Sequence, residues 1–138
     1  MLGSHCLKTW SSTQKNITLS SGEAELVAVV KMSCELIGLT QLAYEWGIEL
    51  IGNVYVDSSA ALGIVKRKGN GKMRHIRVGQ LWIQEKNESG EIKYTKVAGE
   101  MNPADLMTKY LQEALVKRHM DLIGQVFTGG RSDKSLRV

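Results

Sequence analysis

Three acidic residues stand at the ends of predicted secondary-structure elements, in otherwise apolar or capping contexts. They are Glu25 in SSGEAEL, Asp57 in VYVDSSAAL and Asp105 in MNPADLMTK. Carboxylates from a helix, a strand end and a helix start could converge on a divalent cation. Such oxygen ligands suit Mg²⁺, which proteins hold with few carboxylates together with substrate phosphate. Two such ions activate a water and stabilise a leaving oxygen, so the set indicates phosphodiester hydrolysis.

Each acid also has a purely structural explanation. Glu25 lies in the first turn of a predicted helix, where it would complement the helix dipole. It shares that helix's apolar face, however, so we expect its side chain to point inward. Asp57 and Asp105 could simply cap helices. Glu23 is assigned to a capping box with Ser20.

The hydrophobic pattern predicts three strands and four helices in alternation. We expect one extended element over 5–11 and 16–20 with a polar break between, and strands at 53–56 and 91–97. Helices are expected at 21–46, 60–66, 75–87 and 103–123, the last with a break near Tyr110. This order predicts an α/β fold, a sheet with helices packed on it. The polar tail 128–138 is expected to be disordered, which leaves one domain over 1–127.

Composition bounds the cellular setting. Hydrophobic residues make up 43% of the 138 residues, enough for a modest core, and the N-terminus lacks a secretory apolar stretch. No apolar run of about 20 residues is evident, so no membrane partner is expected. Cys6 and Cys34 have no metal-ligand spacing and are interpreted as reduced thiols. We therefore expect an intracellular protein, with cytoplasm and nucleus both open.

Positive charge is concentrated in one segment. The net charge is +4, yet residues 66–77 contain six Lys or Arg and no acid, so the remaining chain is slightly acidic. This segment is a candidate contact for a phosphate backbone, and equally a solvated loop that keeps the protein soluble. The candidate phosphate contacts are Lys66, Arg67, Lys68, Lys72 and Arg74.

Four stretches, in unbroken order over about residues 8–112, resemble the ribonuclease H domain that closes the polyprotein of copia-type retrotransposons. KTWSSTQKNITLSSGEAELVAV resembles its Trp-Ser-Ser strand and the Ser-Ser-x-Glu-Ala-Glu helix start. VYVDSSAALGIV resembles its strand ending in Asp. KMRHIRVGQLWIQEK resembles its Lys/Arg-His-Ile segment, and IKYTKVAGEMNPADLMTKYL its last strand and Ala-Asp-x-x-Thr-Lys close.

The resemblance implies a ribonuclease H-like mixed sheet of five strands with flanking helices. It also implies cleavage of the RNA strand of RNA–DNA hybrids with two Mg²⁺ ions held by four acids. Glu25, Asp57 and Asp105 match the second, third and fourth of these acids. His75 matches the family's His, with an orienting, packing or catalytic role left open. A reverse transcriptase domain would lie upstream in the parent polyprotein.

The first acid and the first two strands of the family have no counterpart in these residues. We therefore expect an N-terminally truncated domain that is inactive alone. Its strands at 16–20 and 53–57 should pair directly or leave open edges, with Ile17, Leu19, Val54 and Val56 poorly covered. The alternatives are a catalytically dead nucleic-acid-binding remnant and an expressed fragment with no selected function.

Overall fold

The computed structural model describes residues 1–3, 5–14, 17–71, 75–76, 78–106 and 108–125. The chain divides into two compact units. Unit 1 comprises Met1–Ser12 and Glu100–Val138, and unit 2 comprises Thr13–Gly99. The predicted disordered tail, 128–138, lies outside the described residues.

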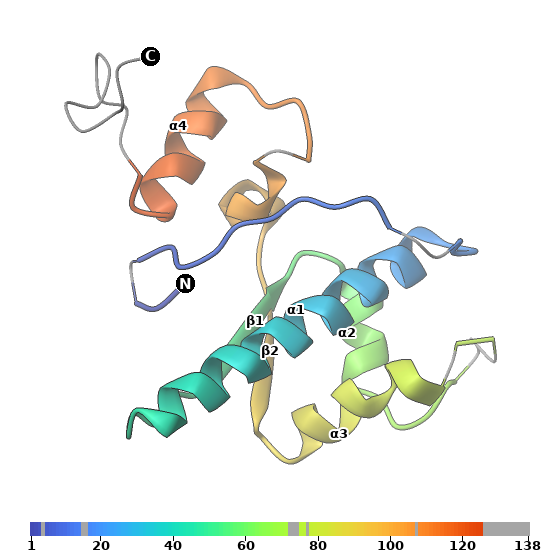
Figure 1. Ribbon diagram of the computed structural model, residues 1–138. Coiled ribbons are helices and arrows are strands. Elements are labelled where there is room, and N and C mark those ends of the chain that lie inside the picture. The colour runs from blue at the N-terminus through green and yellow to red at the C-terminus, as the bar shows by residue number, and fades with distance from the viewer. Residues whose placement is uncertain (4, 15–16, 72–74, 77, 107, 126–138) are drawn as a thin grey trace, which may run out of the picture. The chain divides into compact units, whose positions relative to one another are not determined.

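Unit 2 alternates helices and strands, as the sequence predicts. Its elements are α1 (Ser21–Glu45), β1 (Gly52–Val56), α2 (Ser59–Val65), a 3₁₀ turn at Val78–Gln80, α3 (Trp82–Glu88) and β2 (Ile92–Lys96), all visible in Figure 1. Its architecture is therefore mixed α/β.

Local signals set the limits of α1. The side chain of Ser20 caps the helix by accepting a hydrogen bond from the Glu23 amide, at 3.2 Å. Trp46 is the C-cap, and Gly47 then turns the chain out of the helix with a φ of +76°. Only glycine adopts that conformation without a steric penalty, so this residue ends the helix.

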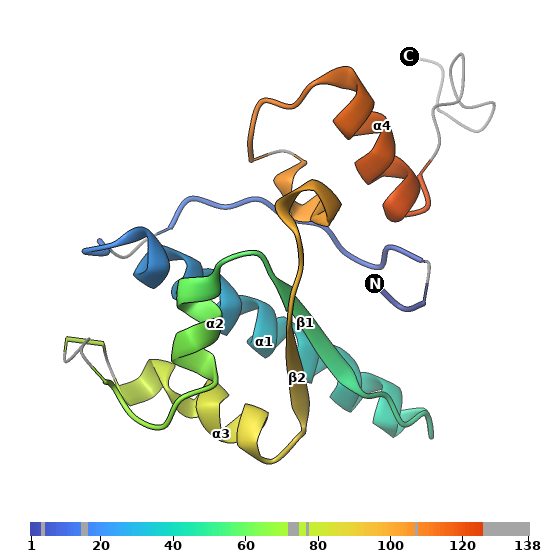
Figure 2. The same ribbon diagram turned by 180° about the vertical axis from the view of Figure 1, so that it is seen from behind.

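The sheet consists of two parallel strands, β1 and β2, paired from Gly52 with Ile92 to Val56 with Lys96. Parallel neighbours need a crossover connection, which α2 and α3 supply. Along β1, Gly52, Val54 and Val56 are buried and Asn53 and Tyr55 are exposed. One face of the sheet is therefore covered and the other is open. Figure 2 shows the two strands side by side.

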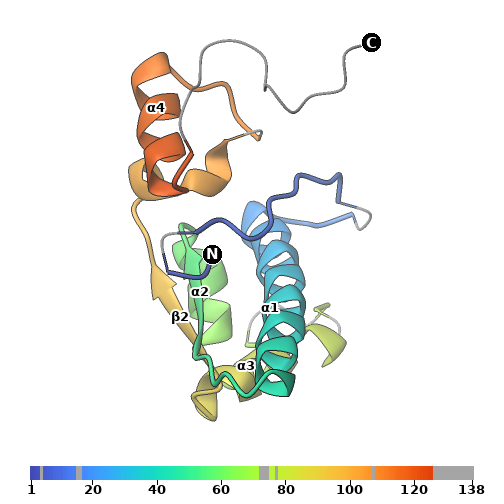
Figure 3. The same cartoon turned by 60° about the vertical axis from the view of Figure 1, so that its left-hand side comes forward.

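Helices α1, α2 and α3 form the covering layer. α1 packs against β1 and α3 against β2, while α2 contacts both α1 and β2 and lies between them in Figure 3. Leu26, Ile83 and Ile92, one from each of α1, α3 and β2, are almost completely buried at the centre of this core.

One polar pair is buried within the apolar core. The Ser33 hydroxyl donates to the Val29 carbonyl at 2.8 Å, so the Tyr94 hydroxyl, 2.9 Å from Ser33 Oγ, donates to Ser33. Burial raises the pKa of Tyr94, which keeps its phenol protonated as a donor. The pair ties α1 to β2.

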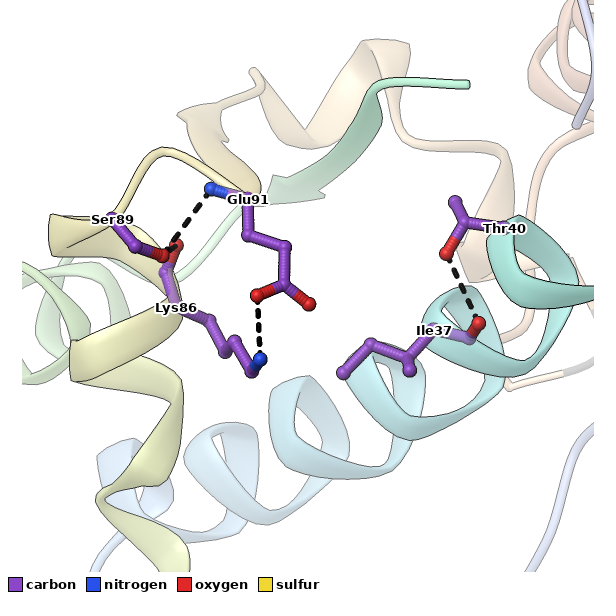
Figure 4. A network of polar contacts seen from close by, with 5 residues as sticks. All are labelled: Ile37, Thr40, Lys86, Ser89 and Glu91. Atoms are coloured by element: carbon purple, nitrogen blue, oxygen red, sulfur yellow. Dashed lines mark hydrogen bonds and ion pairs between the residues drawn. The ribbon is translucent and has the colours of Figure 1, made fainter. Parts of the chain in front are cut away.

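The turn from α3 into β2 is held by side chains. Ser89 Oγ accepts a hydrogen bond from the Glu91 amide, and Lys86 Nζ bonds the Glu91 carboxylate (Figure 4). On α1, Thr40 Oγ1 donates to the Ile37 carbonyl in the same view. The Ser89 and Lys86 contacts hold Glu91, the residue that precedes β2.

Unit 1 is built mainly from short turns. Asn102 caps a 3₁₀ turn, Pro103–Asp105, by accepting from the Ala104 amide at 3.2 Å. The helix expected at 103–123 is wrong in its first half, which forms only this 3₁₀ turn, and the break expected near Tyr110 is confirmed because α4 spans Glu113–Leu122 alone. A second short turn, Gly99–Met101, precedes the first. His119 of α4 is buried.

Several sequence predictions are wrong in detail. Residues 17–20 form no strand, because no strand of the described chain pairs with them. Ile17 and Leu19 are 96% and 76% exposed, which agrees with the expectation that they lack cover. Val54 and Val56 are buried, against expectation, because α1 and α2 cover them. The helix expected at 75–87 begins only at Trp82.

The expected mixed sheet is a parallel pair among the described residues, and the ribonuclease H-like fold stays a prediction. Helix α1 is long and apolar enough to cross a membrane by length and composition alone, although no apolar run of that length was expected. The core helix of a soluble protein meets the same criterion, and α1 packs Leu26 and Val29 into the core of unit 2.

Candidate functional site

Asp57 follows β1 directly, at the carboxyl end of the parallel pair. Lys96, the last residue of β2, lies beside it: its ammonium donates to the Asp57 carbonyl and, at 2.8 Å, to Ser59 Oγ. The next residue, Ser58, caps α2 by accepting from the Ala61 amide at 3.2 Å. Because Ser58 is the cap, Asp57 is not needed for that structural role.

The start of α1 packs against the start of α2. A Cβ on Gly22 would lie 3.0 Å from the Ala60 Cβ, so glycine permits this close approach. Glu25 is three residues after Gly22 and Asp57 is three residues before Ala60. The two predicted metal ligands therefore lie at the same end of unit 2, where active sites of parallel sheets gather.

Glu25 does not point inward as expected. Its side chain is exposed, whereas the buried stripe of α1 runs through Leu26, Val29 and Ser33. Glu25 precedes Leu26 by one position, so it lies beside the buried stripe and not on it. An exposed carboxylate incurs no burial cost, so the burial argument for Glu25 as a ligand does not hold.

Glu23 and His75 form a contact that sequence reasoning missed. The Glu23 carboxylate is buried and accepts from the Leu19 amide at 2.8 Å, with His75 Nε2 3.2 Å from the same oxygen. The hydrogen bond from the Leu19 amide lowers the pKa of Glu23, and His75 lowers it further. The pair is 52 residues apart in sequence, so no local signal could reveal it.

This contact places His75 at the same end of unit 2 as Glu25 and Asp57. His75 is the histidine that matches the family's His, and its partner Glu23 belongs to the first turn of α1. The geometry assigns His75 an anchoring contact, while its chemical role stays a prediction.

Asp105 belongs to unit 1. It ends the turn Pro103–Asp105 and forms an ion pair with Lys109, four residues later, at 2.7 Å. Its carboxylate is largely covered, with 15% of the side chain exposed. Because Glu25 and Asp57 belong to unit 2, the meeting of all three acids stays a prediction.

The donor chemistry fits Mg²⁺, since carboxylate oxygens are the ligands this ion prefers. Among the described residues, no three His, Cys, Asp or Glu side chains are grouped closely enough to hold a metal ion. Within unit 2, two carboxylates at one end are the number with which proteins commonly hold Mg²⁺ when substrate phosphate completes the site.

The basic segment is only partly the exposed loop that the sequence predicts. Lys66 and Lys68 are exposed, but Arg67 is half-buried and donates from Nη2 to the Asn70 carbonyl at 2.6 Å. Lys68 forms an ion pair with Glu88. Lys72 and Arg74 lie outside the described residues. Two lysines therefore remain as described candidates for phosphate contacts.

Comparison with known proteins identifies relatives among retrotransposons. The chain is 31% identical over 121 residues, 84% of its length, to the retrovirus-related Pol polyprotein from transposon TNT 1-94 of Nicotiana tabacum. It is 29% identical, over 91% and 89% of its length, to those from transposons RE2 and RE1 of Arabidopsis thaliana. The chain spans 9% of the length of these curated relatives.

No family model matches the chain, and no solved structure matches it. The homologues that the sequence comparison identifies are retrotransposon Pol polyproteins. The mixed α/β architecture with its parallel strand pair is known from this structure and not from a structural relative.

Proposed function

We propose that the chain is part of a retrotransposon Pol polyprotein and corresponds to the C-terminal part of its ribonuclease H region. In the whole polyprotein this region degrades the RNA strand of RNA–DNA hybrids. A reverse transcriptase domain lies upstream, and the setting is intracellular. Glu25, Asp57 and Asp105 are the metal-binding carboxylates. The proposal rests on the resemblance of four motifs and on Pol polyproteins as homologues.

The observation that carries the proposal is the placement of Glu25 and Asp57 at one end of unit 2. The close approach at Gly22 and Ala60 joins the two helix starts there. His75 is held at the same end by Glu23. Glu25 and Asp57, which are 32 positions apart in sequence, are thus gathered where a substrate phosphate could approach them both.

Each group would have a distinct role. The Glu25 and Asp57 carboxylates would hold the metal, and substrate phosphate would complete its ligand set. When bound, two Mg²⁺ ions would supply an activated water and stabilisation of the leaving oxygen. Lys96, whose ammonium bonds the Asp57 carbonyl and Ser59, adds a positive charge at this end and would favour the approach of a phosphate.

Because these residues provide three of the four carboxylates that the resemblance implies, the chain alone should not cleave a hybrid. Cleavage should appear when an upstream strand bearing the first Asp is joined to the chain. Geometry and charge must both be complete for two-metal catalysis.

The test is a Mg²⁺-dependent cleavage assay on an RNA–DNA hybrid, with the chain alone and with the joined upstream segment. Asp57→Asn should abolish any activity of the joined protein, whereas Asp121→Asn, an exposed acid of α4, should leave it unchanged. Robust cleavage by the chain alone that is lost in Asp57→Asn would refute the requirement for a fourth carboxylate. Activity that survives Asp57→Asn would refute the assigned site.

A second candidate function is nucleic-acid binding without catalysis. The exposed Lys66 and Lys68 favour it, because they lie on a turn of defined shape. Salt-sensitive hybrid binding by the joined protein, without cleavage, would select this function.

A further inference from the structure

The basic loop, Lys66–Gly71, is tied to α3 by one side chain. Gln84 Oε1 accepts a hydrogen bond from the Gly69 amide at 2.9 Å. Gln84 Nε2 donates to the Ile64 carbonyl at 2.8 Å and to the Gly69 carbonyl at 3.1 Å. A single amide group therefore connects α3, the end of α2 and the middle of the basic loop.

The loop itself is closed by Arg67. Its guanidinium bonds the Asn70 carbonyl and lies against Gly71, where a Cβ would be 2.6 Å from Nη1. Gly69 and Gly71 adopt φ values of +72° and +57°, which other residues rarely reach. Arg67 Nε is buried with no hydrogen-bond partner in the described part of the chain. Arg67 thus shapes the loop rather than offering its charge to solvent.

The two lysines before and after Arg67 are placed differently. Lys66 is exposed and forms no ion pair with any described residue. Lys68, 84% exposed, is paired with Glu88 of α3. A shallow cavity of about 340 Å³ lies between the loop and α3, lined on the loop side by Lys66, Arg67 and Lys68 and on the α3 side by Gln84, Glu85 and Glu88.

We propose that Gln84 is a positioning residue for a preformed phosphate-contact surface made by Lys66 and Lys68. The ligand is the sugar–phosphate backbone of a nucleic acid, so the inference rests on the proposed function. Gln84 holds the loop in its bound shape before the ligand arrives, which removes an ordering cost from binding. Glu88 opposes binding, because its ion pair with Lys68 must open for phosphate.

The experiment measures the dissociation constant of the full chain for an RNA–DNA hybrid at several salt concentrations. Gln84→Ala should weaken binding about tenfold, since ordering even one or two loop residues carries that cost. The salt dependence should keep its slope, because no charge is removed. Lys66→Ala should instead reduce the slope by about one phosphate contact. Glu88→Gln should strengthen binding.

Two further variants control for folding and for loss of a glutamine. Gln84→Met has a similar length and no hydrogen bonds, so it should weaken binding like Gln84→Ala while packing is kept. Gln41→Ala, at an exposed position of α1, should bind like the wild type. Hydrogen exchange at the Gly69 amide, which needs no ligand, should accelerate in both Gln84 variants.

The outcomes separate the two proposals. Faster Gly69 exchange with unchanged hybrid affinity would overturn the positioning role and leave the proposed function intact. Unchanged Gly69 exchange would overturn the role directly. A wild-type chain that binds no hybrid at low salt would overturn both. Weaker binding with an unchanged salt slope, in both Gln84 variants, supports the positioning role.

Discussion

Units 1 and 2 hold their candidate ligands in different ways. In unit 2, Glu25 and Asp57 stand at the ends of elements that share a buried core centred on Leu26, Ile83 and Ile92. In the described part of unit 1, Ile123 is the one buried hydrophobic residue, and Asp105 is held by a 3₁₀ turn and an ion pair with Lys109. Core packing thus fixes Glu25 and Asp57 within unit 2, and local contacts fix Asp105 within unit 1.

This difference has a consequence for stability and function. Damage to the core should move Glu25, Asp57 and His75 together, because all three depend on the packing of α1 and α2. Changes in α4 should leave them in place. Mutations placed in one unit at a time therefore test whether the two units differ in this way.

The largest expected effect is in the core. Leu26→Ala should lower the free energy of unfolding by about 2–5 kcal/mol, because it removes a fully buried side chain and leaves a cavity. Leu122→Ala, at a 36% exposed position of α4, should cost less than about 1 kcal/mol. Urea unfolding measures both. Equal losses would show that the two units do not differ as described.

A smaller effect is expected from Glu23 and should depend on pH. Its pKa is lowered from the ordinary value of 4.5, chiefly by the hydrogen bond from the Leu19 amide. A carboxylate whose pKa is lowered by folding stabilises the fold at pH values above its unfolded-state pKa. This stabilisation is lost as the pH falls through the folded-state pKa. Wild type should therefore exceed Glu23→Gln in stability at neutral pH, with the gap closing below pH 4.5.

The measurement is thermal unfolding of both proteins across that range, with Glu45→Gln as an exposed control on α1. The control should track the wild type. A stability gap between wild type and Glu23→Gln that stays constant with pH would mean that the carboxylate's charge contributes nothing.

The sequence predicted the elements that local chemistry determines. Ser20 caps its helix as expected, and both strands of the sheet lie within a residue of their predicted limits. Those signals are contained in a few adjacent residues. The predicted strand at 16–20 failed because alternation alone does not form a strand without a partner to pair with.

The site was predicted less completely than the elements. Asp57 falls at a strand end as expected, but the inward orientation of Glu25 was wrong by one helical position. The contacts between Glu23 and His75 and between Gln84 and Gly69 join distant segments. Only tertiary packing brings such residues together, so no spacing in the sequence could indicate them.

The central claim is that Glu25 and Asp57 form one metal-binding edge of unit 2, and Mg²⁺ titration followed by NMR tests it most directly. We predict that amide signals near Glu25 and Asp57 shift together with one binding curve, and that Asp57→Asn removes both responses. Shifts at Asp105 with the same curve would add the third ligand. No response at Glu25 and Asp57, or separate responses that survive Asp57→Asn, would contradict the claim.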